Sequence, residues 1–275
     1  MRRLPPGPLA TWLRNTPEIE IWPAWLLRAR ASAQARLLAR SVRVLRRKRD
    51  GSFLAAVCSR RLVPLVPALE REPGLDAARA ALARQAPARG ARIGVLPLGR
   101  LTQRLATLGL AAEDYQAATG LSPVPEPAWL VLAGRDRWRR PLWLHPHAAR
   151  AWLRMQAAAT ADGIVLQAIS GYRSHDYQLG IFARKRARGL DLAAILAVNA
   201  APGFSEHHGG CALDLGTPGD APAEESFERT AAFAWLCRHA ADFGFRMSYP
   251  RGNPHGITYE PWHWCWHAPG AGPDR

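Results

Sequence analysis

Two short stretches in the second half of the chain contain the residue types of a hydrolytic metal site. The first runs over residues 205–214 and the second over residues 260–263. A catalytic zinc ion usually takes three protein ligands from His nitrogen and carboxylate oxygen, and it keeps a fourth position open for water. His207, Asp214 and His263 could fill those three places. We therefore expect one zinc ion per chain, held by these three side chains.

Glu260 is the residue that could move protons in such a site. The attacking water must lose a proton, so a carboxylate that is not itself a ligand has to stand within hydrogen-bond reach of it. Glu260 lies three residues before His263, and in an extended stretch Pro261 and Trp262 would set where the two side chains point. We expect Glu260 to accept the proton and to pass it later to the leaving amine.

The first stretch predicts a turn followed by a short strand. The glycine pair at residues 209–210 allows the backbone to turn. Residues 211–215, Cys-Ala-Leu-Asp-Leu, would then form a strand whose alternation places Ala212 and Asp214 on the face of Gly210.

The ordered set of motifs resembles the D-alanyl-D-alanine carboxypeptidases of the VanY type. This family belongs to a group of zinc peptidases that includes D-Ala-D-Ala dipeptidases and some phage endolysins, and whose fold is shared by the Hedgehog signalling domain. The resemblance covers about residues 140–267, and its pieces come in the order Ser170-Gly-Tyr-Arg173-Ser174, Gln178, Ser205-x-His207-x-x-Gly210-x-Ala212-x-Asp214, Phe243-Gly-Phe245, Ser248-Tyr249-Pro250 and Glu260-x-Trp262-His263.

The resemblance implies an α+β fold, with a small antiparallel sheet flanked by helices, preceded here by a helical basic N-terminal extension. It implies removal of the terminal D-alanine from peptidoglycan stem peptides that end in D-Ala-D-Ala. Arg173 would stabilise the oxyanion, an effect on the order of 3 kcal/mol, or hold the anionic end of the substrate. Gln178, Ser205 and Trp262 would contact the substrate, with helix capping or a surface position as the alternative for Gln178 and Ser205.

Other functions of the same residues stay open. The site could cut an internal bond of the stem peptide or a free D-Ala-D-Ala dipeptide. In a different class, the domain could be a zinc-stabilised binding module without activity. Glu260 and Arg173 argue against that class, because a purely structural zinc ion needs neither residue.

The sequence departs from the family after His263. The resemblance leads us to expect Arg-Tyr or a similar pair there, but Trp264-Cys265-Trp266-His267 follows, which bears on substrate specificity. Cys211 and Cys265 flank metal ligands, so a disulfide, a thiolate contact or simple burial are the alternatives. The four cysteines follow no CxxC pattern: Cys58, Cys211, Cys237 and Cys265.

Five further histidine positions could belong to the site or lie outside it. His145 and His147 could clasp a metal, but Pro146 between them is typical of a helix start and favours a structural role. His208 would point away from the ligands, as a surface residue or a neighbour of the site. His255 and His267 are not assigned.

Charge divides the chain unevenly. Of its 275 residues, the first hundred hold 20 Lys and Arg against 6 Asp and Glu, which is +14 of the net +15. We expect a basic N-terminal extension over residues 1–120 and the catalytic domain over residues 121–275, with Pro123, Pro125 and Pro127 marking a linker or an arm.

The basic segment at residues 24–49 has roughly helical spacing. A helix there could bind nucleic acid, anionic lipid or a cell-wall polyanion, or it could be a solvated face. The basic segment lacks the interleaved aromatic residues that are typical of nucleic-acid binding. For the catalytic domain we expect no nucleic-acid partner, and its partner would be a peptidoglycan stem peptide or precursor.

The N-terminus does not read as a secretory signal. Met1-Arg-Arg is followed by Leu4-Pro-Pro-Gly-Pro rather than by an apolar run, and no stretch reaches the ~18 apolar residues of a membrane span. The family substrate implies the periplasm or cell envelope, whereas the start as written implies the cytoplasm.

Local patterns predict most of the remaining elements. Helices are expected over residues 74–84, 102–110, 113–119, 148–162 and 225–243. Strands are expected over residues 53–58, where a helix segment is the alternative, and over 164–170, 245–249 and 259–266.

Overall fold

The computed structural model describes residues 11–59, 61–88 and 90–268. These residues form two compact units: unit 1 contains residues 11–97 and 126–132, and unit 2 contains residues 98–125 and 133–268. The segment at residues 1–8, on which the expectation about an export signal rests, lies outside the described residues. Within the described ranges, every helix is too short or too polar to cross a membrane.

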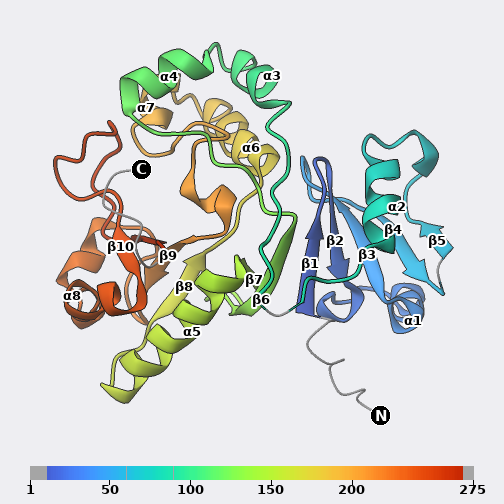
Figure 1. The fold of residues 1–275 in the computed structure, drawn as a ribbon, viewed down its shortest axis with the longest axis horizontal. Helices are drawn as coiled ribbons and strands as arrows, with labels where there is room; N and C mark the ends of the chain where they lie inside the picture. Colours follow the sequence, from blue (N-terminus) through green and yellow to red (C-terminus); the bar gives the residue numbers. More distant parts are fainter. Residues whose placement is uncertain (1–10, 60, 89, 269–275) are drawn as a thin grey trace. The chain divides into compact units, whose positions relative to one another are not determined.

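Unit 1 is an antiparallel sheet with short helices. Its strands follow the order β5-β4-β3-β2-β1-β6 (Figure 1). The elements are β1 (Trp12–Asn15), β2 (Ile19–Pro23), η2 (Ala24–Leu26), α1 (Ser32–Arg40), β3 (Arg43–Arg47), β4 (Phe53–Cys58), β5 (Arg61–Pro64), η3 (Leu69–Arg71) and α2 (Leu75–Ala83). Strand β6 (Trp129–Arg135) pairs with β1 and continues into unit 2.

The expected helical N-terminal extension is not confirmed. Residues 24–49 contain the three-residue 3-10 helix η2 and the short helix α1, which has no buried residue, and then turn into β3. Val44 and Leu45 of β3 are fully buried against their neighbours in β2 and β4. Burial of these apolar side chains in the sheet outweighs the helical spacing of the Ala, Leu and Arg residues around them, because propensity is a weak prior beside tertiary packing.

Unit 1 contains a buried ion pair. The Lys48 ammonium lies 2.5 Å from Oε2 of Glu126, and both side chains are almost inaccessible to solvent. The amide of Asn15 donates to the same oxygen of Glu126. Two charges removed from water in this way depend on each other, because either one alone would be buried without compensation.

Replacement of Glu126 by Ala is expected to destabilise unit 1 by about 3–5 kcal/mol, since it leaves the Lys48 charge buried and unpaired. Chemical denaturation followed by tryptophan fluorescence measures this loss. Glu70→Ala, which breaks the exposed pair with Arg79, is the matched control and should scarcely move the midpoint. The double variant Lys48→Met with Glu126→Leu should recover most of the stability. If Glu126→Ala and Glu70→Ala shift the denaturation midpoint equally, the buried ion pair does not contribute to stability as described.

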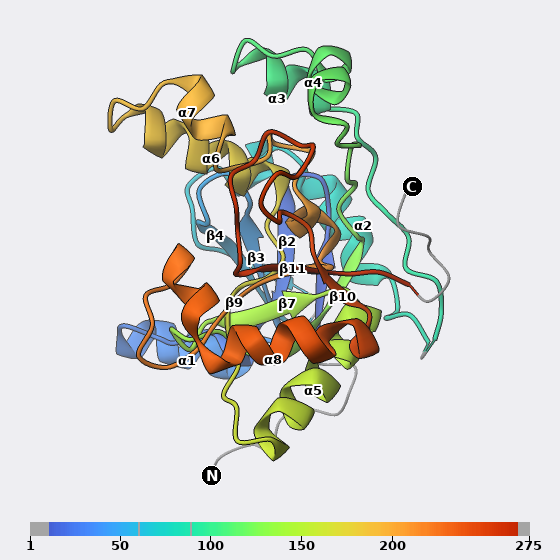
Figure 2. The ribbon, with the colours of Figure 1, turned by 90° about the vertical axis from the view of Figure 1, so that its left-hand side faces the viewer.

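Unit 2 carries both metal-site stretches on a second antiparallel sheet, with strand order β10-β11-β9-β8. In Figures 1 and 2, α5 and α8 lie on one side of this sheet, and α3, α4, α6 and α7 lie toward the other. The elements are α3 (Leu101–Ala106), α4 (Ala112–Thr119), β7 (Pro141–Leu144), α5 (Pro146–Ala161), β8 (Gln167–Ser170), α6 (His175–Arg186), α7 (Leu192–Leu196), η4 (Glu206–Gly209), β9 (Ala212–Gly216), η5 (Glu225–Arg229), α8 (Ala231–His239), η6 (Ala240–Phe243), β10 (Phe245–Met247) and β11 (His263–Trp266). The expected α+β class with an antiparallel sheet flanked by helices is confirmed.

Residues 98–125 pack onto the loops that precede the two motifs. Leu105 and Tyr115 join a buried cluster with Phe204 and Tyr249, and the Tyr115 hydroxyl accepts a hydrogen bond from the backbone of Ala201. These helices therefore hold the chain segments that lead into residues 205–214 and 260–263. The expected division near residue 120 falls inside unit 2.

Two expected elements differ in extent from those observed. The single helix expected over residues 225–243 is divided into η5, α8 and η6. The strand expected over residues 259–266 begins only at His263, because the backbone N–H of His263 donates to the carbonyl of Glu260 and closes a turn. Glu260 is thereby placed before the strand rather than within it.

Candidate metal centre

Three elements of unit 2 bring the expected ligands together. His207 lies on η4, Asp214 in the middle of β9, and His263 at the start of β11. The β9–β11 register places His263 directly opposite Asp214. Oδ1 of Asp214 lies 3.2 Å from Nε2 of His207 and 3.2 Å from Nδ1 of His263. All three residues are buried.

The turn between the first two ligands is made by Gly210. Its φ of +68° lies in the left-handed region, which glycine adopts without steric penalty. The backbone N–H of Gly210 donates to the carbonyl of His207, which closes the turn before β9 begins at Ala212. The predicted turn and strand are both present.

The hydrogen bonds of the two imidazoles fix which nitrogen atoms face Asp214 without a proton. Nδ1 of His207 lies 2.7 Å from the carbonyl of Gly171, and Nε2 of His263 lies 2.8 Å from a carboxylate oxygen of Glu206. Both partners can only accept, so these nitrogens carry the ring protons. In the neutral rings, the other two nitrogens direct lone pairs at the Asp214 carboxylate. Three electron-rich atoms facing one another fit a cation such as Zn²⁺.

The pKa values of these groups follow from burial and mutual charge. Burial, reinforced by the Arg173 charge, lowers the pKa of His207 to about 4, which keeps this imidazole in the neutral form that binds metals. Burial alone would raise the pKa of Asp214, but His207 and its other neighbours hold it well below its usual value. Burial also opposes the charge on His263, yet hydrogen bonds to Asp214 and Glu206 raise its pKa to about 10, so a bound cation would take the place of that proton.

Glu260 stands beside the ligands without being one of them. Its Oε2 lies 3.8 Å from Nδ1 of His263, beyond hydrogen-bond distance. Burial raises the pKa of Glu260 to about 7, with a further contribution from the Asp214 charge. A carboxyl group that gains and loses its proton near neutral pH can act as a base and then as an acid.

Two cations belong to the same region. The Arg173 guanidinium lies 3.8 Å from Oδ2 of Asp214, and its buried Nε has no hydrogen-bond partner among the described residues. Lys185 of α6 is partly buried, which lowers its pKa, while the charges of Glu260 and Arg173 shift that pKa in opposite directions. Lys185 lies in the last turn of α6, far from the metal-site stretches in sequence, so only the fold reveals its relation to the site.

The three residues expected to contact substrate occupy different settings. Gln178 on α6 is 1% exposed and donates to the carbonyl of Ala200. Ser205 is buried directly before η4. Trp262 is partly exposed between Glu260 and His263, and its carbonyl accepts from the backbone of Leu215. Their contacts with substrate stay predictions.

The remaining histidines support the site or lie apart from it. His208 is fully buried, and its ring contacts the carbonyl of Arg173 and accepts from the backbone of Gly203. His145 caps the start of α5, in agreement with the structural role inferred from Pro146. Among the described residues, neither His145 nor His147 belongs to a cluster that could hold a metal.

Glu206 is a residue of the candidate site that sequence reasoning missed. One of its oxygens, Oε2, lies 2.8 Å from Nε2 of His263 and accepts from the Ser248 hydroxyl at 2.6 Å. A carboxylate that holds the far nitrogen of a metal-binding His orients the ring and raises its basicity. The position of Glu206 in the sequence, directly before the candidate ligand His207, was the one feature that could have indicated its role.

A comparison with protein families agrees with this geometry. Residues 141–269 match the family model described as VanY: D-alanyl-D-alanine carboxypeptidase. This part of the chain, a little under half of its length, is similar to the VanY family. The matched range includes all three ligands, Glu260 and Arg173.

Several proteins are similar to this part of the chain in sequence. YodJ of Bacillus subtilis is 38% identical over 125 residues, which are 44% of this chain and 45% of that protein. The bifunctional D-Ala-D-Ala dipeptidase and D-Ala-D-Ala carboxypeptidase VanXYC of Enterococcus gallinarum is 29% identical over 143 residues, 50% of this chain and 73% of that protein. The match thus spans less than half the length of YodJ.

Two solved structures illustrate the similarity. The LdcB LD-carboxypeptidase is 35% identical, with a TM-score of 0.42 over 45% of this chain and 59% of that chain. VanYB in complex with D-alanine-D-alanine is 26% identical, with a TM-score of 0.41 over 49% of this chain and 76% of that chain.

Proposed function

We propose that this protein is a zinc-dependent carboxypeptidase that removes the terminal D-alanine from peptidoglycan stem peptides ending in D-Ala-D-Ala. The observation that carries the proposal is the convergence of three buried, electron-rich ligand atoms beside a separate carboxyl group. His207, Asp214 and His263 would hold the metal, and Glu260 stands 3.8 Å from the nearest ligand nitrogen. The similarity of residues 141–269 to the VanY family and the activities named for the relatives support the substrate class.

Bound zinc would polarise the scissile carbonyl and ease ionisation of the attacking water. Glu260 then accepts the proton of that water, since its pKa of about 7 matches the pH at which the protein would work. After the tetrahedral intermediate forms, the same carboxyl group donates this proton to the leaving amine of D-alanine. The raised pKa makes both transfers accessible to one residue.

Arg173 and Lys185 would handle the negative charges of the reaction. The guanidinium of Arg173, whose Nη2 lies 3.8 Å from Oδ2 of Asp214, can stabilise the developing oxyanion. Lys185 would bind the C-terminal carboxylate of the peptide, which every carboxypeptidase substrate carries. A pair of cations at the site favours a terminal carboxylate over an uncharged internal peptide bond.

Lys185→Ala is expected to raise KM for a stem pentapeptide by roughly 10- to 100-fold with little change in kcat, because a charge-assisted hydrogen bond contributes ~1.5–3 kcal/mol. Steady-state kinetics of D-alanine release measures it. Arg188→Ala removes an exposed cation just beyond the same helix and should leave KM unchanged. An unaltered KM in Lys185→Ala would exclude this role.

A panel of peptides tests the substrate class. The purified protein is incubated with a stem pentapeptide, the corresponding tetrapeptide, a cross-linked stem dimer and free D-Ala-D-Ala, and the products are identified by mass. We expect loss of one alanine from the pentapeptide alone. Preferred cleavage of the dimer would identify an endopeptidase, and preferred cleavage of the free dipeptide would identify a dipeptidase. Peptide binding without any product would instead indicate a zinc-stabilised binding module.

A further inference from the structure

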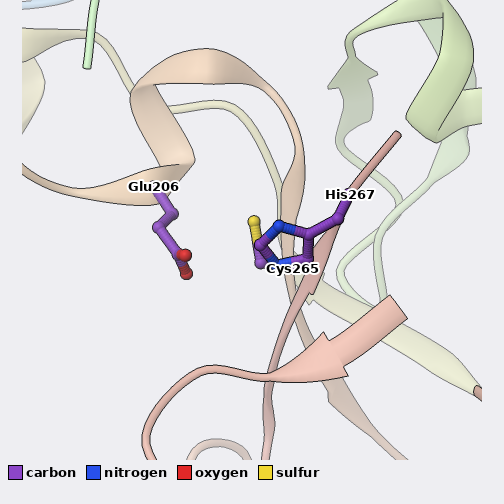
Figure 3. A group of neighbouring side chains, drawn as sticks. All are labelled: Glu206, Cys265 and His267. Atoms are coloured by element: carbon purple, nitrogen blue, oxygen red, sulfur yellow. The ribbon is translucent and has the colours of Figure 1, made fainter. Parts of the chain in front are cut away.

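A second cluster of metal-binding side chains lies next to the first. Glu206, Cys265 and His267 each offer one ligand atom, and these atoms all lie within 4.8 Å of one another. Figure 3 shows the three side chains directed toward a common space, with Glu206 coming from η4 and the other two from β11 and the residue after it. None of the three belongs to the group formed by His207, Asp214 and His263.

The strand geometry explains why these side chains meet. Successive side chains of a strand alternate between its faces, so His263, Cys265 and His267 form a row on one face. Strand pairing fixes the row: Cys265 lies opposite Ala212 of β9, and the backbone N–H of His267 donates to the carbonyl of Gly244. The stretch after His263 that departs from the family pattern therefore supplies two ligands beyond the catalytic one.

Glu206 connects the two clusters through its carboxylate. Its hydrogen bonds to His263 and Ser248 both use Oε2, and the Cys265 thiol lies within hydrogen-bond reach of the same carboxylate. Cys265 is 5% exposed, while Glu206 and His267 are partly exposed. The cluster is thus closed on the side of the thiol and reachable by an ion on the side of the imidazole.

We propose that Glu206, Cys265 and His267 form a second zinc site that nothing in the catalytic scheme requires. Thiolate sulfur, imidazole nitrogen and carboxylate oxygen are the ligand types that Zn²⁺ accepts together. The Cys265 thiol releases its proton to solvent on binding, because the thiolate is the ligand. Three protein ligands leave one position of the tetrahedron for water.

The second ion would act on structure rather than on the peptide bond. It would tie η4, which carries His207, to the end of β11, which carries His263. By holding Glu206 it would also fix the carboxylate that orients the His263 ring. The site therefore goes beyond the proposed function, and its occupancy can be measured without any substrate.

Zinc content under reducing conditions tests the proposal. The protein is stripped with chelator, reloaded with Zn²⁺, freed of unbound metal and analysed by elemental mass spectrometry. We expect two zinc ions per chain in the unaltered protein, and one each in Cys265→Ser, His267→Gln and Asp214→Asn. Combining Cys265→Ser with Asp214→Asn should leave almost none. Cys237→Ser, which alters an exposed thiol on α8, is the matched control and should keep both ions.

Cobalt substitution identifies the thiolate ligand directly. Co²⁺ bound to sulfur gives a charge-transfer band in the near ultraviolet, which nitrogen and oxygen ligands do not produce. The band should appear in the unaltered protein, Asp214→Asn and Cys237→Ser, and disappear in Cys265→Ser. One zinc ion in the unaltered protein, or a cobalt spectrum without the sulfur band, would overturn the second site while leaving the peptidase proposal untouched.

Discussion

Replacement of Glu260 by Gln is expected to lower kcat for D-alanine release by about 10²- to 10⁴-fold, the usual contribution of a positioned general acid–base. The amide keeps the shape and polarity of the side chain but can neither accept the water proton nor return it to the amine. Because Glu260 is not among the three clustered ligand residues, the zinc content should stay unchanged. Stopped and continuous assays of D-alanine release measure kcat, and elemental analysis measures the metal.

Two comparisons make this result specific. Glu113→Gln changes an exposed carboxylate at the start of α4 and should retain full turnover. Circular dichroism of Glu260→Gln should match that of the unaltered protein. If Glu260→Gln keeps its zinc and turns over at the normal rate, another group moves the proton and the proposed mechanism is wrong.

Asp214→Asn should abolish activity through loss of the metal. Asp214 is the carboxylate that faces one ring nitrogen of each imidazole, at 3.2 Å from both. Loss of its charge removes the only anionic ligand from the first cluster. Changes to residues that merely support ligands cost about 10- to 100-fold in metal affinity, so we expect a loss of more than 100-fold here. Zinc titration against a competing chelator measures the affinity.

Asp191→Asn is the matched control for this variant. Asp191 is exposed and caps α7 through its side chain, a role that Asn also fills. Its zinc affinity and turnover should equal those of the unaltered protein. Tight zinc binding by Asp214→Asn at the first cluster would show that the three ligands are wrongly assigned.

The three residues that cluster at the candidate metal centre could be named from the sequence because their pattern is local. His207 and Asp214 lie seven residues apart, around a glycine turn that the sequence shows, and His263 is marked by the neighbouring Glu260. The strand pairing that places His263 opposite Asp214 was not needed to name the ligands. The spacing and the chemistry of the side chains were enough to name the three residues, but they did not give the distances between them.

The features that sequence reasoning missed depend on contacts between distant segments. Unit 1 is a sheet because β2, β3 and β4 bury one another's apolar side chains. This pairing between strands cannot be recognised from residues 24–49 alone, whose apolar spacing is roughly helical. The contact of Glu206 with His263 joins residues that are 57 positions apart. Likewise, the cluster of Cys265 and His267 with Glu206 appears only when β11 lies beside η4.

Release of D-alanine from a stem pentapeptide, measured before and after metal removal, tests the central claim most directly. The purified protein should release D-alanine, lose this activity on treatment with chelator, and regain it when Zn²⁺ is added back in slight excess over the chain. Glu260→Gln should stay inactive at every step despite binding zinc. Release that persists in the stripped protein, or no release from a fully zinc-loaded protein, would contradict the assignment as a zinc carboxypeptidase.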